Sequence, residues 1–249
     1  MTAALLVGHR DTGRRKDSAG RTILLHLAPG AAAMAVYAAA APIARHVGVP
    51  TIAALAVSGL LGVAPVQLAV LAGARRAGEP VILLRARLPV RQVVCCVLAE
   101  LLLAALAFAL TAPLGAWLEA TAFAWWPAGW ALDPGTGGGS GRGPLLITAA
   151  LVMLGSVVVA PLVEEFYFRG YLLPRMPARL GPFTSLTHAA LFAGYHVWTP
   201  WLVPTRILAV LPLAYIARRT GDLRIGMVTH AVLNSVDVVV LLHVVVLGS

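Results

Sequence analysis

The sequence predicts an all-α fold, a polytopic transmembrane bundle of about seven helices, with eight as the alternative count. The composition gives the first indication: 59% of the 249 residues are hydrophobic, only 12% are charged, and the mean hydropathy is +0.86. So few charges cannot cover the surface of a soluble domain. The second indication is that apolar runs close to the ~20 residues of a spanning helix recur along the chain.

Seven such runs of mainly apolar residues are candidate spans. They cover residues 22–44, 51–73, 92–114, 145–163, 184–198, 206–217 and 225–247. The fourth run is predicted to continue as a helix through Arg169. The fifth and sixth runs are short for a bilayer, and the count of seven therefore carries an uncertainty of one.

Four regions follow from these runs. Residues 1–21 are predicted to form a basic cytoplasmic tail, and residues 22–114 three N-terminal transmembrane helices. Residues 115–144, which are rich in tryptophan and glycine, are predicted to form an outer loop, because tryptophan favours the membrane interface and glycine runs favour flexible loops. Residues 145–249 are predicted to hold the polar residues of a functional core.

The basic residues are distributed unevenly between the predicted loops. The net charge of +9 is compatible with nucleic-acid binding, but short basic clusters between apolar runs are explained more simply by the positive-inside rule. With seven spans and a cytoplasmic N-terminus, 16 of the 19 Lys and Arg residues lie on the inner side. We therefore expect a multi-pass protein of the cell membrane, with its C-terminus outside and with no nucleic-acid partner.

Two adjacent carboxylates end the fourth apolar run. Glu164 and Glu165 are followed by Arg169, and charged groups inside a bilayer are usually functional because they are costly there. Glu165 precedes Arg169 by four residues, the favourable order for an ion pair along one helix face. Glu164 points about 100° away from Glu165 and has no local basic partner. Because no ion pair holds its charge, Glu164 is the candidate for a general base that takes up a proton. The alternative is that both glutamates form a structural ion-pair cluster.

Two later helices carry further polar side chains. His196 follows Ala193 and Gly194, which permit close approach of a neighbouring helix. His230 and Asn234 are four residues apart and project from one face of the last span, where they can donate hydrogen bonds to an oxyanion. The alternatives are an interfacial histidine for His196 and a helix–helix hydrogen-bond seam for the other two. The roles of Glu100 and Asp237, two more acids within spans, remain open.

These motifs together resemble those of one family. The ordered set of Glu164-Glu165-x-x-x-Arg169, Phe192-x-x-x-His196 and His230-x-x-x-Asn234 is similar to the signature of the CAAX-protease and bacteriocin-processing family, also called the Abi family. The resemblance implies a bacterial intramembrane protease, a hydrolase that cleaves a peptide or membrane-protein substrate within the lipid bilayer. It implies that residues 145–249 are the catalytic core.

The resemblance gives a mechanism and leaves two alternatives. Glu164, assisted by His196, would activate the attacking water, while His230 and Asn234 would stabilise the oxyanion and Glu165 with Arg169 would hold the first motif in place. No cofactor is needed in this scheme. The alternatives are a zinc-dependent CAAX-type metalloprotease, with Glu164, His196 and His230 as ligands, and a non-catalytic membrane protein for immunity or transport.

Overall fold

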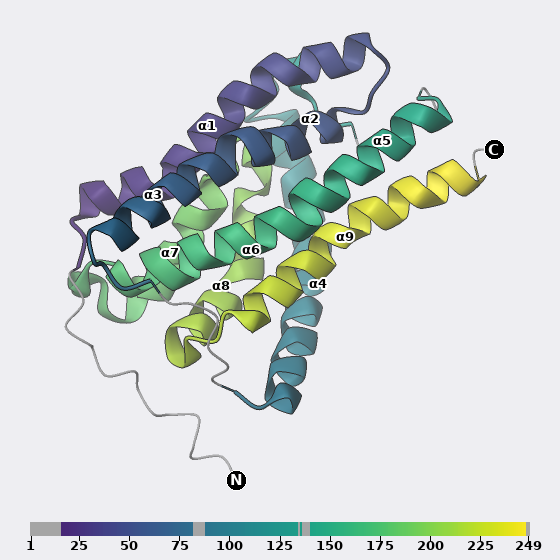
Figure 1. Cartoon of the computed structure of the whole chain (residues 1–249). Coiled ribbons are helices and arrows are strands. Elements are labelled where there is room, and N and C mark those ends of the chain that lie inside the picture. The colour runs from purple at the N-terminus through teal and green to yellow at the C-terminus, as the bar shows by residue number, and fades with distance from the viewer. Residues whose placement is uncertain (1–15, 82–87, 134, 136–139, 248–249) are drawn as a thin grey trace.

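The computed structural model describes residues 16–81, 88–133, 135 and 140–247, and within these ranges the regular structure is entirely helical (Figure 1). The predicted all-α class is therefore confirmed. The basic tail predicted for residues 1–21 lies mostly outside the described residues, as does most of the glycine run of the outer loop. The α-helices are α1 (Ala19–His46), α2 (Thr51–Ser58), α3 (Ala64–Arg76), α4 (Val90–Ala120), α5 (Arg142–Val152), α6 (Ala160–Glu164), α7 (Thr184–Gly194), α8 (Val203–Thr220) and α9 (Arg224–Leu247).

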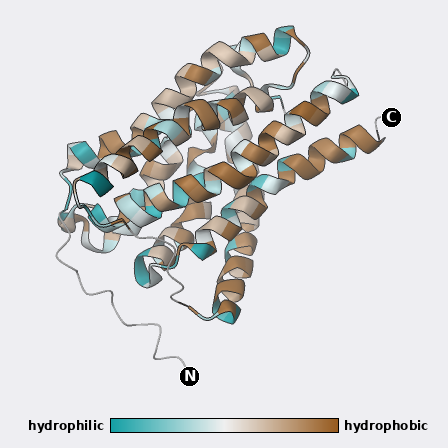
Figure 2. Ribbon diagram, viewed as in Figure 1, coloured by the Kyte–Doolittle hydropathy of each residue, from teal (hydrophilic) through white to brown (hydrophobic). Residues whose placement is uncertain are grey.

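Six helical stretches in the described ranges are long and apolar enough to cross a bilayer, which makes this a multi-pass membrane protein. Figure 2 shows their apolar residues along the rods and the hydrophilic residues mainly toward the helix ends. The six stretches are Ala19–His46, Thr51–Arg76, Val90–Ala120, Arg142–Arg175, Pro200–Thr220 and Arg224–Val246.

The fifth candidate span differs from the prediction. Its helix, α7, has only 11 residues and ends at Gly194, so it rises about 16 Å, roughly half of a bilayer core. The chain then continues without α-helix through residues 195–199 to the short helix Pro200–Leu202. There the ring of Trp201 lies 5.9 Å from that of Trp126 in the predicted outer loop. Such irregular backbone is tolerated at membrane depth where protein surrounds it, and Tyr195, Trp198 and Thr199 are buried.

Two other predicted boundaries also shift. The sixth candidate is longer than its apolar run, because α8 begins with Pro204 near its N-terminus and ends where Gly221 adopts a positive φ of 65°. Proline in the first turn and glycine just after the last turn are the usual helix start and stop signals. Helix α4 continues through Pro113 to Ala120, and the first residues of the predicted outer loop are therefore helical.

Polar contacts gather the helix ends into two groups. At one end, Arg175 contacts Asp17 before α1 at 3.2 Å and Glu79 after α3 at 3.4 Å. At the other end, Arg45 donates a hydrogen bond of 2.7 Å to the carbonyl of Ala131. The start of α1 and the loop after α3 therefore lie at the same end as Arg175, as alternating passes through a bilayer require.

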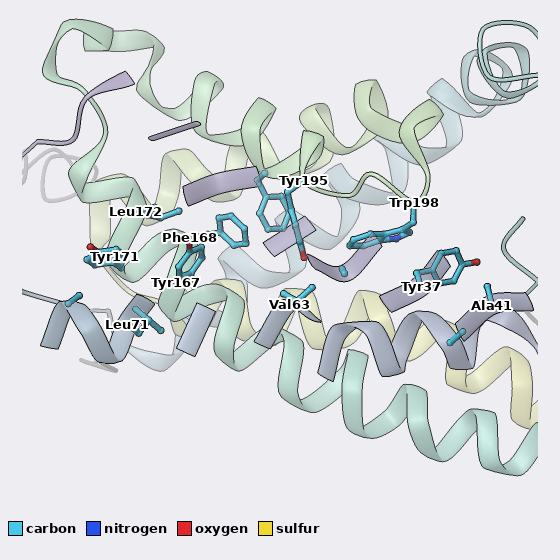
Figure 3. Packing of buried hydrophobic residues seen from close by; sticks show 14 residues of the cluster. Tyr37, Ala41, Val63, Leu71, Tyr167, Phe168, Tyr171, Leu172, Tyr195 and Trp198 are labelled. Carbon is cyan, nitrogen blue, oxygen red and sulfur yellow. The ribbon is translucent and has the colours of Figure 1, made fainter. Parts of the chain in front are cut away.

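The largest cluster of buried apolar side chains joins α1, α2 and α3 to the helices that carry the candidate site (Figure 3). It includes Tyr37 from α1 together with Tyr167, Phe168 and Tyr195. Gly30 of α1 lies so close to the backbone carbonyl of Tyr195 that a Cβ atom would not fit between them. Small residues of this kind let helix backbones approach in a membrane, and α1 thereby supports the segment that follows α7.

Candidate functional site

The site is built on the fourth long helix, which departs from α-helical hydrogen bonding on both sides of Pro161. Residues Met153–Val159 and Glu165–Leu172 adopt π-helical turns, and the short α6 lies between them with Pro161 in its first turn. Proline removes a backbone donor, and π-turns inside α-helices occur frequently at functional sites. The second π-helical segment begins directly after Glu164, where the two acidic residues diverge.

Glu165 and Arg169 form the predicted ion pair, which is thereby confirmed. Their side chains are each 1% exposed, and Arg169 Nη1 lies 2.9 Å from Glu165 Oε1. The guanidinium also lies over the ring of Phe192, 4.1 Å from its centroid, which adds a cation–π contact. Behind the carboxylate, Gly226 of α9 packs so closely that a Cβ atom would collide with it. These contacts fix Glu165 in one orientation.

Glu164 points to different surroundings. Its side chain is buried and lies beside the side chain of Tyr195. No basic residue lies within ion-pair distance of Glu164 in the part of the chain that the structure describes, as the sequence predicts. A Tyr hydroxyl at this place can donate a hydrogen bond to an ionised carboxylate.

His196 follows α7 and has a defined orientation. Its Nδ1 atom lies 2.9 Å from the carbonyl oxygen of Phe192, and since a carbonyl only accepts hydrogen bonds, the Nδ1 atom carries the proton in this contact. The Nε2 atom of the neutral ring then has a lone pair and can accept a proton. This tautomer suits a general base. His188, which the sequence analysis did not select, bonds instead to His26 at 3.1 Å.

His230 and Asn234 extend from one face of α9, one turn apart. His230 Nδ1 lies 3.9 Å from Glu165 Oε1, which brings the last motif beside the first. Asn234 Nδ2 donates a hydrogen bond of 2.7 Å to the carbonyl of Ser156, and this bond holds the amide while its second hydrogen remains available. Asp237 lies one turn further along α9 and is exposed.

Five of the six predicted residues line one cavity of about 120 Å³, and Glu164 does not belong to its lining. The cavity lies between α4, α8, α9 and the Glu165–Leu172 segment. Its lining consists of Glu165, Arg169, His196, His230 and Asn234 together with Glu100, Phe108, Phe192, Arg206, Ala209, Val210, Leu213, Thr229 and Leu233. A mixed acid, base and amide lining of this kind can activate water and bind an oxyanion.

The comparison with known families identifies the segment that carries these residues. Residues 146–236 match the family described as type II CAAX prenyl endopeptidase Rce1-like. Over this segment, about a third of the chain, the sequence is similar to the CAAX protease family. The resemblance drawn from the motifs is thus confirmed, and the family implies a protease. No match was found among curated proteins or among solved structures.

Three polar residues of the cavity were not selected as site residues from the sequence. Glu100 on α4 and Thr229 on α9 are buried, and Arg206 on α8 donates hydrogen bonds to the backbone carbonyl and the hydroxyl of Thr199, at 3.1 and 2.7 Å. An acid and an arginine within apolar runs are signals that sequence can give. Their partners come from other helices, and only the tertiary structure shows that they meet in one cavity.

Zinc would need Glu164, His196 and His230 to converge, and in this arrangement they do not. Glu164 lies beside Tyr195 and outside the cavity lining, whereas the two histidines belong to that lining. No three His, Cys, Asp or Glu side chains of the described ranges are grouped so that they could hold a metal ion. Whether activity depends on zinc is decided by the chelation experiment below.

Proposed function

We propose that this protein, which is similar to the CAAX protease family over residues 146–236, is an intramembrane endopeptidase that hydrolyses a peptide bond of a peptide or a membrane-associated protein. The observation that carries the proposal is the cavity among spanning helices, which brings His196, His230 and Asn234 together with the Glu165–Arg169 pair. Peptide hydrolysis needs a water molecule, a proton acceptor and donors for the oxyanion, and this lining supplies residue types for each.

In the proposed reaction, Glu164, assisted by His196, takes a proton from a water molecule. The oxygen of this water attacks the scissile carbonyl carbon at the same time. The carbonyl oxygen becomes an oxyanion, to which His230 and the free amide hydrogen of Asn234 donate hydrogen bonds. The C–N bond then breaks, and the same proton passes to the leaving amine nitrogen. Glu165 and Arg169 hold the first motif against α9.

A specific observation favours a second assignment of the acid. Glu165 lines the cavity, and its Oε1 atom lies 3.9 Å from His230 Nδ1. Glu164 lies outside the lining, beside Tyr195. In this variant of the mechanism Glu165 takes the proton, and Glu164 orients Tyr195 and the histidine that follows it. Both variants give the same products, and the separate Glu→Gln substitutions described in the Discussion decide between them.

The experiment that tests the proposal compares the peptides of membranes that contain the wild-type protein, the His196→Ala protein or the His243→Ala protein at equal levels. His243 is exposed on α9 and lies outside the cavity lining, so it is a matched control for losing a histidine. We expect new peptide termini with the wild type and with His243→Ala, and their loss with His196→Ala. Identical peptide sets from all three membranes would favour a non-catalytic immunity or transport protein.

A further inference from the structure

Four residues of the cavity lining have buried polar atoms without a hydrogen-bond partner: Glu165 and Arg169, which contact each other as an ion pair, and Glu100 and Thr229, which have no such pairing. Glu100 is 2% exposed and Thr229 is 1% exposed, and Glu100 Oε2 and Thr229 Oγ1 are buried without a hydrogen-bond partner. Both residues line the cavity that also holds His230 and Glu165. Leaving a buried polar atom unsatisfied costs about 1 to 3 kcal/mol, so such atoms in a cavity indicate a ligand that completes them.

Glu100 comes from α4, which lies outside the matched segment 146–236. It has no ion-pair partner among the described residues, and the nearby Arg169 is already held by Glu165 at 2.9 Å. The carboxyl group of Glu100 offers an acceptor oxygen whether it is ionised or protonated. Its free Oε2 atom is therefore suited to accept a hydrogen bond from a ligand's N–H group.

Thr229 differs from four other threonines in or at the end of helices, although it shares its unpaired hydroxyl with Thr22 of α1. The hydroxyls of Thr111, Thr121, Thr148 and Thr220 each donate to the carbonyl four residues earlier, at 2.6 to 2.9 Å. Thr229 makes no such bond, although it lies inside α9 and directly before His230. Its hydroxyl is therefore available to donate to a carbonyl group in the cavity.

We propose that Glu100 and Thr229 bind the main chain of an extended peptide next to the reacting bond, with Glu100 Oε2 accepting a substrate N–H and Thr229 Oγ1 donating to a substrate carbonyl. The inference rests on the proposed peptidase function and names its substrate-binding residues. A peptide that enters a bilayer in extended form loses its hydrogen bonds to water, and the enzyme must replace them.

The remaining lining indicates which side chain the bound peptide presents. Phe108, Ala209, Val210, Leu213 and Leu233 form an apolar wall. The cavity volume of about 120 Å³ corresponds to roughly four water molecules at ~30 Å³ each. A single aliphatic side chain fits such a space beside this wall, and an uncharged aliphatic peptide is therefore a suitable probe.

The test measures binding separately from hydrolysis. The probe is acetyl-pentaleucine-amide with a tritiated acetyl group, which has no charged terminus, so that its affinity depends on main-chain and aliphatic contacts. Its Kd is measured in lipid nanodiscs on the His196→Ala background, together with four further substitutions. Glu100→Gln keeps an acceptor oxygen, Glu100→Leu removes it, Thr229→Val removes the hydroxyl, and Thr148→Val is a control that removes a buried hydroxyl outside the cavity lining.

We expect Glu100→Leu and Thr229→Val each to raise the Kd about tenfold, the equivalent of one hydrogen bond, while Glu100→Gln and Thr148→Val stay within about twofold. Five probes that carry a single N-methyl group locate the bonded amide. Methylation of that amide should raise the Kd for a protein that retains Glu100. It should cause no further rise in the Kd for the Glu100→Leu protein.

Equal affinity in all variants, additive losses throughout the N-methyl series, or no binding of the probe at all would overturn the inference. Intact binding without any cleavage by the wild-type protein would instead count against the proposed peptidase function. A purely structural role of Glu100 or Thr229 would lower thermal stability, which is measured in the same samples, and would not depend on where the probe is methylated.

Discussion

Gly226 on α9 lies directly against the carboxylate of Glu165, and no Cβ atom fits between them. The contact fixes the distance between α9, which carries His230 and Asn234, and the segment that carries the two glutamates. The geometry of the cavity therefore depends on the absence of a side chain at one position.

Gly226→Ala is expected to abolish most turnover, because the new methyl group must displace either the Glu165 carboxylate or α9. Displacing the carboxylate separates it from Arg169 and His230. Gly59→Ala is the matched control, since a Cβ atom there meets nothing within 4 Å. The measurement is the rate of peptide hydrolysis by purified protein. Full activity of Gly226→Ala would contradict this role of the glycine.

The two glutamates are expected to respond differently to substitution. Glu164→Gln should abolish turnover and leave the thermal unfolding midpoint nearly unchanged, because Gln can keep a contact with Tyr195. Glu165→Gln and Arg169→Ala should lower the midpoint as well, since breaking a buried ion pair typically costs about 3 to 5 kcal/mol. The two readouts are hydrolysis and thermal unfolding in detergent. An active Glu164→Gln protein beside a stable, inactive Glu165→Gln protein would assign the base to Glu165.

Asn234→Ala is expected to slow hydrolysis by about 10² to 10³, the usual loss for one oxyanion donor, and to leave the metal content unchanged. Ser235→Ala, at the next position of α9, is the control. The wild-type protein should retain activity in a strong chelator and contain less than one zinc per chain by elemental analysis. A tightly bound zinc that is lost together with activity would instead make Glu164, His196 and His230 ligands.

The orientation in the membrane is tested with single cysteines after Cys95 and Cys96 are replaced by alanine. Ala128 lies in the region predicted to be outside and Ala77 follows α3 at the opposite end, and both are exposed alanines. In intact cells an impermeant thiol reagent should label Ala128→Cys and leave Ala77→Cys unlabelled. The reverse labelling pattern would place the N-terminus outside.

Hydropathy predicts the long helices well because a bilayer imposes one length on every span. It fails for residues 184–198, an apolar run already short for a span, where the helix stops at Gly194. The polypeptide is surrounded by protein there, and its backbone packs on α1 where Gly30 lies against the carbonyl group of Tyr195. Such packing depends on distant residues, and an apolar run does not reveal it.

For the site, helical spacing predicts contacts along one helix and not between helices. The pair Glu165–Arg169 follows from a separation of four residues. The place of Glu164 beside Tyr195 depends on a residue outside its own helix. The convergence of Glu100 and Thr229 on one cavity likewise depends on how two helices pack. Glu164, Glu100 and Thr229 have no partner one helical turn away, and their surroundings therefore cannot be inferred from the sequence.

The contact between Asp17 and Arg175 spans 158 residues of sequence, and this separation has a consequence during biosynthesis. At about 5 to 20 residues per second, Arg175 is made roughly 8 to 32 s after Asp17. Helix α1 must therefore remain in the membrane during this interval without its final anchor. Arg21, whose guanidinium lies 3.2 Å from Asp17, is synthesised within the same turn and can neutralise the carboxylate until Arg175 follows.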